Sequence, residues 1–364
     1  MPQSCKELTT KLASLKQLKA EFDLELSNLP QTGKTEDLVL VRTAKTKLVQ
    51  GFKELQKSIW PLENTELTWE NIEAQYEFQK EVLIKAGLVK TLATGELGIE
   101  AIDNKEYPIP TLEQIEKMML EKRDFFETKI PQGFVKLIMV PFGLPIGSLI
   151  EAYDQALMEH HQRGELLDTQ NQPLGLNKEI GKKFIDDDGA KDYSQAEATG
   201  DLVYFLKPSS ESNYLTQNNY QSKTKQELLP TQAWQVLLIE NLPDLPERGQ
   251  GKTFNGRKQL EACQSSYSYL EQLQIDQYKG EQGLTPESWL VYGLSHLVQS
   301  KQMIESQGGE FDFRSCFLVG GCFKKTGYIS RVYFDRLNTQ VGLSRIDPSN
   351  ANYNDATRFA VSIF

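Results

Sequence analysis

The spacing of apolar residues predicts helices in the first part of the chain. Five of these residues recur every three or four positions and so share one helix face: Leu8, Leu12, Leu15, Leu18 and Phe22. Similar spacing predicts helices over 35–57 and 69–86, and Gly87 stands where a glycine commonly ends a helix. Because no catalytic group of residues gathers there, we expect residues 1–126 to form a helical region with a structural role.

Beyond residue 101 the pattern becomes mixed. Thr111 is a good N-cap for a helix that reaches Lys122. Thr285, Pro286 and Glu287 form a strong helix start, with a capping hydroxyl, a proline in the first turn and then an acid. Apolar runs and periodicity predict strands over 134–140, 202–206 and 235–240, and helices over 145–162, 256–273 and 285–306.

The last fifty residues follow a different pattern, with short strands, glycines and polar loops. Residues 331–335 alternate with period two, and Val332 and Phe334 are the apolar members, as in a half-buried strand. Polar and turn-forming residues follow, up to 355. The alternation over 357–363 predicts a terminal strand that pairs with earlier strands of the same domain.

The same stretch differs in charge from the rest of the chain. Residues 314–364 contain two Lys, five Arg and three Asp, a net charge of +4. Since the whole chain carries −10, residues 1–313 carry −14. Tyr, Arg, Asn and Ser on loops are typical of a binding surface, because they combine rigid aromatic area with adaptable hydrogen bonding. A solvated edge of a β-domain would have a similar composition, so both interpretations stay open.

Composition excludes several classes of protein. A chain of 364 residues, 39% hydrophobic and 25% charged, is long enough for two globular domains. Its acidic balance argues against a nucleic-acid binder that works by bulk charge, and its apolar runs are too short for a membrane span. Four cysteines do not make a disulfide framework, and the start shows no signal-peptide pattern. We therefore expect a cytoplasmic protein.

Two loops resemble ligand motifs only in part. Residues 249–253, Gly-Gln-Gly-Lys-Thr, are expected between a strand and a helix, but Pro246 stands where a phosphate-binding loop needs its first glycine. Four acids within 186–197 have the spacing of a calcium loop, but Lys191 stands where that loop needs glycine. A solvated acidic turn is the simpler interpretation of the second segment.

Histidines and cysteines predict no metal site. Adjacent His160 and His161 point about 100° apart on a helix and make a poor metal pair. Cys316 and Cys322 could approach each other, but they lack a nearby histidine for a zinc site. Buried free thiols are the simpler expectation. We therefore predict no metal, no cofactor and no catalytic residues.

One segment resembles a known family. Residues 284–289, Leu-Thr-Pro-Glu-Ser-Trp, are similar to a helix of formylglycine-generating-enzyme-like domains, a branch of the C-type-lectin fold. The ending, with Gly320-Gly321, an aromatic strand and 356–361, is similar to the closing strands of that branch. Polar positions rich in Asn, Tyr, Asp, Ser and Arg resemble the variable proteins of diversity-generating retroelements. In that family a reverse transcriptase rewrites adenine positions at the end of the gene and so varies a ligand-facing surface.

The resemblance implies an α+β protein with an N-terminal helical segment, 1–126, followed by a C-type-lectin-like domain, 127–364. Its ligand-binding surface would lie within 328–355. The implied ligand is a macromolecule, most simply a protein, with no role for nucleic acid or membrane, and the N-terminal helices could join copies of the chain. We expect one exposed face to carry the site: Arg331, Tyr333, Asp335, Asn338, Arg345, Asn350, Asn352, Tyr353, Asn354 and Asp355.

Two alternatives of other classes remain. The first is a copper-dependent oxidase-like enzyme of the formylglycine-generating type, which would need both Cys316 and Cys322. The second is a nucleotide-binding protein that uses Lys252 in the 249–253 loop.

Overall fold

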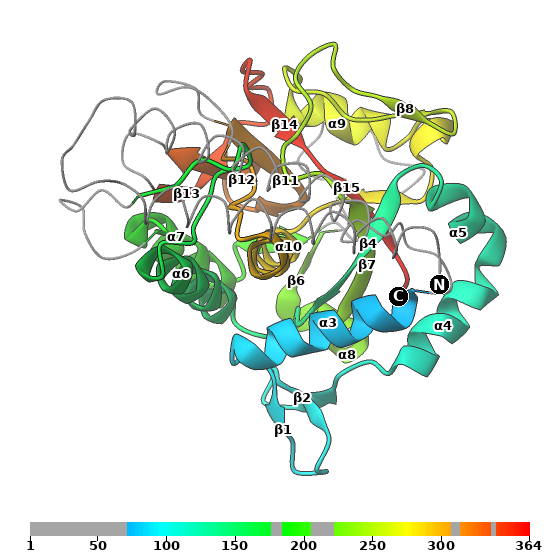
Figure 1. Ribbon diagram of the computed structural model, residues 1–364, viewed down its shortest axis with the longest axis vertical. Coiled ribbons are helices and arrows are strands. Elements are labelled where there is room, and N and C mark those ends of the chain that lie inside the picture. Colours follow the sequence, from blue (N-terminus) through cyan, green and yellow to red (C-terminus); the bar gives the residue numbers. More distant parts are fainter. Residues whose placement is uncertain (1–70, 176–183, 205–221, 307–313, 336–339) are drawn as a thin grey trace, which may run out of the picture. The chain divides into compact units, whose positions relative to one another are not determined.

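Figure 1 shows the computed structural model of the chain, coloured along the sequence. The structure describes residues 71–175, 184–204, 222–306, 314–335 and 340–364, all within one compact unit, Leu67–Phe364. The helices predicted over residues 8–22 and 35–57 lie outside the described residues. The described part is a mixed α+β fold with eight α-helices and several antiparallel sheets, which confirms the predicted fold class at that level.

The first sheet has the order β10-β15-β7-β4 and is antiparallel throughout. Its strands are β4 (Phe134–Val140), β7 (Gln235–Glu240), β10 (Glu281–Gly283) and β15 (Phe359–Ser362). Every residue of β7 is buried, as its continuous apolar run predicts. The C-terminal strand β15 lies between β7 and β10, so the expected pairing of the terminal strand is confirmed.

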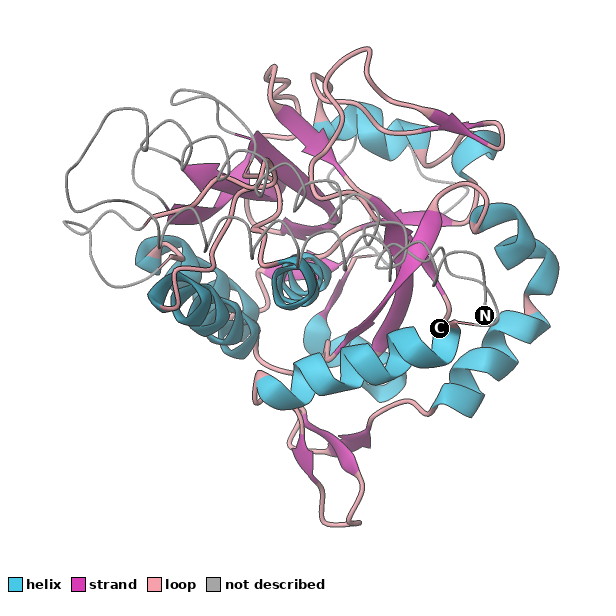
Figure 2. Ribbon diagram, viewed as in Figure 1, coloured by secondary structure: helices cyan, strands magenta, loops and turns pink. Residues whose placement is uncertain are grey.

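Helices α3 (Ile72–Lys85) and α10 (Pro286–Ser300) pack against β4 of this sheet, and α6 (Ile146–Gln162) packs against α10 (Figure 2). The predicted start of α10 is confirmed, because the Thr285 hydroxyl accepts from the backbone N–H of Ser288, 3.2 Å away. The helix ends earlier than predicted, at Ser300, where Lys301 turns to a φ of +63°. Residues 286–297 are all buried, so α10 is a central core helix.

The motif that carries the family resemblance is buried. Glu287 lies 3.0 Å from Lys225 Nζ. Trp289 donates through Nε1 to Glu305, 2.8 Å away, and the same carboxylate accepts from Arg358 Nε at 2.9 Å. All five side chains are buried, so this motif joins α10 to the start of α8, to the loop that follows α10 and to the link between β14 and β15.

The expectation that residues 1–126 are helical fails for 90–108. That segment forms an antiparallel three-stranded sheet of β1 (Lys90–Thr91), β2 (Leu97–Glu100) and β3 (Glu106–Pro108). Helices α4 (Leu112–Glu121) and α5 (Arg123–Lys129) follow. The proposed domain boundary at 126/127 falls inside α5, and Phe126 is fully buried in the core that also contains β4. Residues 71–126 therefore pack with the rest of the compact unit.

The second sheet has the order β13-β12-β11-β5-β6. Its strands are β5 (Leu202–Tyr204), β6 (Lys223–Thr224), β11 (Arg314–Phe323), β12 (Tyr328–Asp335) and β13 (Gln340–Ile346), and β14 (Asp355–Thr357) runs parallel to β11. Helix α7 (Asp187–Ala198) packs against β13 and β5, and α8 (Lys225–Gln232) follows β6. Asp186, the first acid of the suspected calcium loop, caps α7 through the backbone N–H of Gly189.

The predicted helix over 256–273 is wrong in its first half. Residues 253–258 form a hairpin of β8 (Thr253–Phe254) and β9 (Arg257–Lys258), and only α9 (Ser266–Gln272) is helical, before the 3-10 turn η1 (Asp276–Tyr278). Asn255 and Gly256 both have positive φ, 43° and 78°, as a tight hairpin turn requires. This turn chemistry overrides the apolar spacing. None of the described helices is long and apolar enough to cross a bilayer.

Candidate ligand-binding surface

The two faces of β12 have different environments. Val332 and Phe334 point toward the main core, on the side that we call the inner face. Arg331, Tyr333 and Asp335 point the other way, on the side that we call the outer face, and all three are half-buried. The predicted alternation of β12 is therefore confirmed, although its polar side is less exposed than expected.

Strand register defines which residues of neighbouring strands share the outer face. Tyr333 lies opposite Ser315 of β11 and Gly342 of β13, and Ser315 lies beside Asp355 of β14. Directly paired residues project to the same side of a sheet. Asp355, Ser315, Tyr333 and Gly342 therefore form one row across four strands.

Gly342 makes room for the ring of Tyr333. A Cβ atom at position 342 would overlap the phenol ring, which packs directly against Gly342 of β13. Burial raises the pKa of the Tyr333 hydroxyl above its ordinary value, so this phenol stays neutral near pH 7. The ring is thus a fixed, partly exposed aromatic surface.

Arg331 lies over this ring. Its guanidinium carbon is 4.9 Å from the ring centroid of Tyr333, a cation–π distance. Its Nη2 atom is 3.9 Å from Oδ1 of Asp355, and the Arg331 side chain is 22% exposed. Its Nε atom is buried and has no hydrogen-bond partner among the described residues. Arg331 therefore has hydrogen-bonding capacity that its neighbours do not use.

Asp355 is buried, which corrects the expectation that it belongs to the exposed set. It is 2% exposed at the start of β14. Its carboxylate accepts from the hydroxyl of Ser315 and from Asn352 Nδ2, the latter at 2.8 Å. Asp355 thus holds Arg331 and Asn352 in place from beneath, and it presents no free side chain to a ligand.

Arg345 does not share a face with Arg331, which corrects a second expectation. It lies opposite Ser330, one position out of phase with Arg331, so it projects to the inner-face side. There its Nε atom is 3.4 Å from Asp192 of α7 and its guanidinium carbon is 5.2 Å from the ring centroid of Phe323. Arg345 therefore does not belong to the outer face that Arg331 and Tyr333 share.

The loop 347–354 lies beside the outer face, since it leads directly into β14. Asn350, Asn352 and Tyr353 are exposed, Tyr353 to 66%, while Asn354 is half-buried. The backbone N–H of Ser349 donates to Asp347 Oδ1 at 2.9 Å, which fixes the first turn of the loop. Asn338 lies outside the described residues. The structure thus brings together the outer face of β12 and three exposed side chains of this loop.

Sequence reasoning missed Ser315 and Gly342, the supporting residues of this surface. Neither has a side chain that suggests binding, and both matter only through strand register. A glycine inside a strand indicates a close approach by a neighbouring group, so Gly342 could have indicated from the sequence that a side chain packs there.

The two cysteines proposed for copper face opposite sides of β11. Cys316 pairs with Val332 and lies in the main core, whereas Cys322 pairs with Ile329 and lies in a second apolar cluster. Burial raises the pKa of both thiols, that of Cys322 to about 12, so both stay protonated at neutral pH. This arrangement does not present a thiolate pair to one metal ion.

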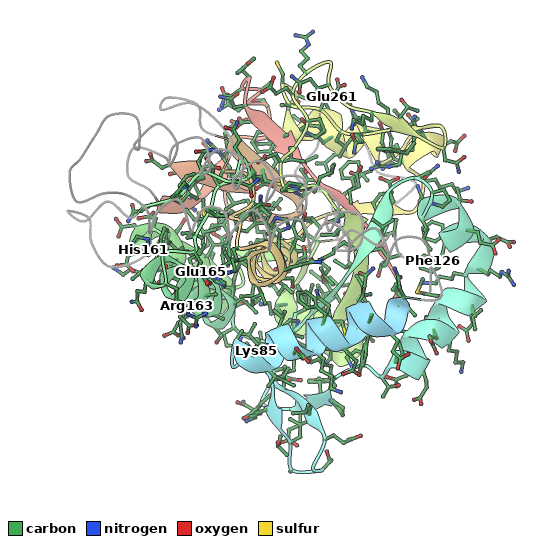
Figure 3. All side chains as sticks on the ribbon, in the orientation of Figure 1. Lys85, Phe126, His161, Arg163, Glu165 and Glu261 are labelled. Atoms are coloured by element: carbon green, nitrogen blue, oxygen red, sulfur yellow. The ribbon has the colours of Figure 1, made fainter. Side chains whose placement is uncertain are left out.

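The loop 249–253 leads into a hairpin rather than a helix, and its amides are occupied. The N–H groups of Gly251 and Lys252 donate to Glu261 Oε1 and Gln259 Oε1 at 2.8 and 3.0 Å. Both amides are therefore already bonded to side chains, that of Gly251 to Glu261, which is labelled in Figure 3. Among the described residues, no cluster of three or more His, Cys, Asp or Glu is placed to hold a metal ion.

The outer face and the loop 347–354 together form a partly aromatic surface, on which Arg331 has a buried Nε without a hydrogen-bond partner among the described residues. Comparison of the chain with family models, with curated proteins and with solved structures finds no match.

Proposed function

We propose that this protein is a ligand-binding protein that presents a diversified surface on a C-type-lectin-like scaffold. The surface consists of the outer face of β12 and the loop 347–354. Its ligand is a macromolecule, most simply a protein, and binding involves no covalent chemistry. Location in the cytoplasm and association of copies through the N-terminal segment belong to the same proposal.

The observation that carries the proposal is the Arg331–Tyr333 pair. Both side chains are half-buried, and Gly342 and Asp355 support them from beneath. Arg and Tyr are enriched among the few interface residues that dominate binding energy. A fixed pair loses less conformational freedom on binding than two mobile side chains, which favours affinity.

The separation of side chains by face supports the variable character of the surface. Val332 and Phe334 maintain the core, while Arg331 and Tyr333 do not enter it. Exposed loop residues such as Tyr353 can change even more freely. Such a scaffold can keep its fold while its surface side chains vary.

Copper-dependent oxidation and nucleotide binding fit these observations less well. The first would need Cys316 and Cys322 to converge, but they face opposite sides of β11. The second would need free amides at Gly251 and Lys252, which already have side-chain partners.

A display experiment tests the proposal with three libraries in the full chain. The first varies the outer face and loop: Arg331, Tyr333, Asp335, Asn350, Asn352 and Tyr353. The second varies the inner face and core: Val332, Phe334, Val341, Leu343, Phe359 and Val361. The third varies exposed positions on α4: Glu113, Lys117, Leu120 and Glu121. Each library is selected against immobilised hen lysozyme as the probe.

We expect the first library to remain largely folded and to yield lysozyme binders. The second should lose folded protein in most members, because it disrupts buried packing. The third should fold but yield few binders, because four side chains on one helix present less continuous surface than a strand face with its adjoining loop. Equal yields from the first and third libraries, or equal unfolding in the first and second, would contradict the proposal.

A further inference from the structure

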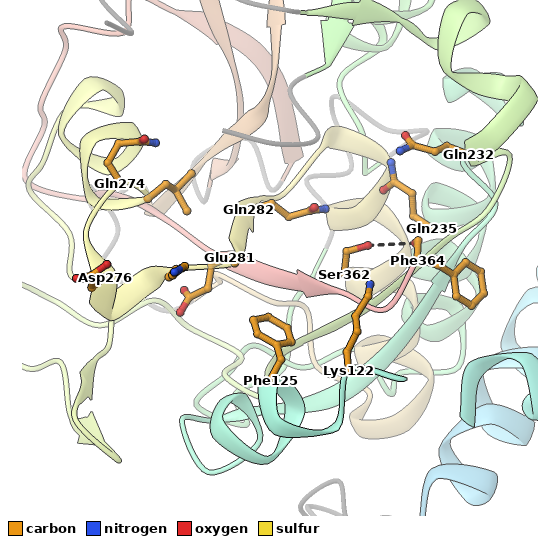
Figure 4. Close-up of a pocket in the computed structure, with 13 residues that line it drawn as sticks. Lys122, Phe125, Gln232, Gln235, Gln274, Asp276, Glu281, Gln282, Ser362 and Phe364 are labelled. Carbon is orange, nitrogen blue, oxygen red and sulfur yellow. Dashed lines mark hydrogen bonds between the residues drawn. The ribbon is translucent and has the colours of Figure 1, made fainter. Parts of the chain in front are cut away.

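A second candidate site lies on the first sheet and shares no residue with the outer face. A pocket of about 640 Å3 opens between α5, the end of α8 and the strands β7, β10 and β15 (Figure 4). This volume is within the range of small-molecule sites, roughly 300–1,000 Å3. The side chains used below are Lys122, Phe125, Gln232, Gln235, Gln282 and Ser362.

The strand register places polar groups on one side of the sheet at this pocket. Ser362 pairs with Leu237, and Gln235 lies two positions from Leu237 on the same strand. Gln282 pairs with Ala360, two positions from Ser362. Side chains two positions apart project to the same face. Gln235, Gln282 and Ser362 therefore point into the same space, as Figure 4 shows.

Gln235 is the unusual residue of this group. It is 4% exposed, and both its Oε1 and Nε2 atoms are buried and without a hydrogen-bond partner among the described residues. Oε1 of the neighbouring Gln232 is buried and unpartnered as well. Buried polar groups almost always have partners, and an unsatisfied one lowers stability. A complete, unpaired amide at the wall of a pocket indicates that a ligand supplies the missing partner.

The missing partner must offer an acceptor and a donor together, because a glutamine amide carries two N–H donors and one carbonyl acceptor. A carboxylate could accept from Nε2 but would face Oε1 with a second negative oxygen. An amide, a lactam or a nucleobase edge satisfies both atoms. Phe125 supplies an apolar wall for a planar ring, and Lys122 already donates to the Ile363 carbonyl at 2.9 Å.

We propose that this pocket binds a small, uncharged, planar ligand with an amide group, and that Gln235 pairs with this amide. The proposal does not depend on the function assigned to the outer face. It needs no change in the backbone, since the amide is already directed into the pocket.

Saturation-transfer NMR on the full chain tests the ligand class with three matched probes. Benzamide carries the amide, methyl benzoate lacks its donor, and benzoate replaces it with a charge. We expect benzamide to bind with a Kd on the order of 1 mM, as suits a fragment of this size. Methyl benzoate and benzoate should bind at least about tenfold more weakly, because they leave one atom of Gln235 unpaired. Equal binding of the three probes, or no transfer to benzamide, overturns the proposal.

Two variants then locate the binding. Gln235→Leu should weaken benzamide binding at least about tenfold and leave the melting temperature unchanged or higher, because it removes an unpaired buried amide. Gln259→Leu is the control, since Gln259 is also buried but pairs at both ends, with Glu240 and with the Lys252 N–H. It should lower the melting temperature and leave benzamide binding unchanged. Unchanged binding in Gln235→Leu, or unfolding of that variant, contradicts the assignment.

Discussion

Arg257 and Arg331 show how the same chemistry has different consequences in two regions. Arg257 is fully buried beside the first sheet, where its Nε is 2.8 Å from Glu281 Oε1 and its Nη1 is 3.1 Å from Glu240 Oε1. Arg331 lies on the second sheet with its side chain 22% exposed, and its Nη2 atom is 3.9 Å from Oδ1 of Asp355.

Both guanidinium groups lie over aromatic rings, that of Arg257 at 4.6 Å from the Phe134 centroid and that of Arg331 at 4.9 Å from the Tyr333 centroid. Residue type and stacking therefore do not distinguish a structural arginine from a recognition residue. The two arginines differ in exposure and in hydrogen bonding: Arg257 is fully buried and forms several short charge-assisted bonds, while Arg331 is partly exposed and retains an unpaired buried Nε.

The largest expected effect comes from removing Arg257. Arg257→Met leaves Glu281 and Glu240 buried with Lys129 as the remaining cation. Breaking one partner of a buried pair costs about 3–5 kcal/mol of unfolding free energy. Urea unfolding measures it, and exposed Arg248→Met should cost less than about 0.5 kcal/mol. A loss of unfolding free energy below about 1 kcal/mol for Arg257→Met would contradict the structural role that we assign to Arg257.

The buried core around α10 should also respond to acid, through His296. Burial, together with nearby Lys136 and Arg358, lowers the pKa of His296 from 6.5 to about 3. The unfolded chain gains a proton below about pH 6.5 while the folded chain does not, so stability falls as pH decreases from 6.5 toward 3. This slope is at most about 1.4 kcal/mol per pH unit.

The His296→Gln variant cannot take up this proton. Between about pH 6.5 and 5, wild type should therefore lose roughly 1–2 kcal/mol more stability than the variant. Urea unfolding at the two pH values measures the difference. Parallel losses in both proteins would show that His296 is not held neutral by the core.

On the outer face of the second sheet, Gly342→Ala tests the position of Tyr333. The new Cβ would overlap the ring, so the ring must move, and the unfolding free energy should fall by about 1–2 kcal/mol. In a Tyr333→Ala background the same change should cost less than about 0.5 kcal/mol, because the clash is gone. Gly175→Ala, with no atom near its Cβ position, is the matched control. Equal costs in the two backgrounds would contradict the described contact.

The smallest expected effect comes from Tyr353. This side chain is 66% exposed, so Tyr353→Ala should change the unfolding free energy by less than about 0.5 kcal/mol. Tyr333→Ala should cost more, about 1 kcal/mol, because its ring lies between Gly342 and Arg331. Thermal unfolding of both variants compares them. A larger loss for Tyr353 than for Tyr333 would reverse our assignment of anchored and free aromatics.

The sequence predicts well those elements whose signal is local. The apolar runs 134–140 and 235–240 match β4 and β7 residue for residue, and Thr111 caps α4 as expected. The alternation of 331–335 correctly separates the two faces of β12. In each case the pattern of one segment and its own caps determine the outcome.

Prediction from the sequence fails for features that depend on how one segment pairs with another. The side to which Arg345 projects follows from the pairing of β12 with β13, which the period of a single strand cannot define. Burial of Asp355 follows from the parallel pairing of β14 with β11. The helix predicted over 256–273 fails because the Asn255–Gly256 turn forms a hairpin instead.

The central claim is that the outer face varies while the scaffold stays constant. Sequencing the DNA beside the gene, together with the end of the gene in many clones, tests it most directly. We predict a reverse-transcriptase gene and a near-copy of the bases that encode residues 314–364, with differences mainly at adenines. Substitutions should change codons for Arg331, Tyr333 and Tyr353 and spare those for Val332 and Phe334. The absence of such a copy, or substitutions that fall equally on the core codons, would contradict the account.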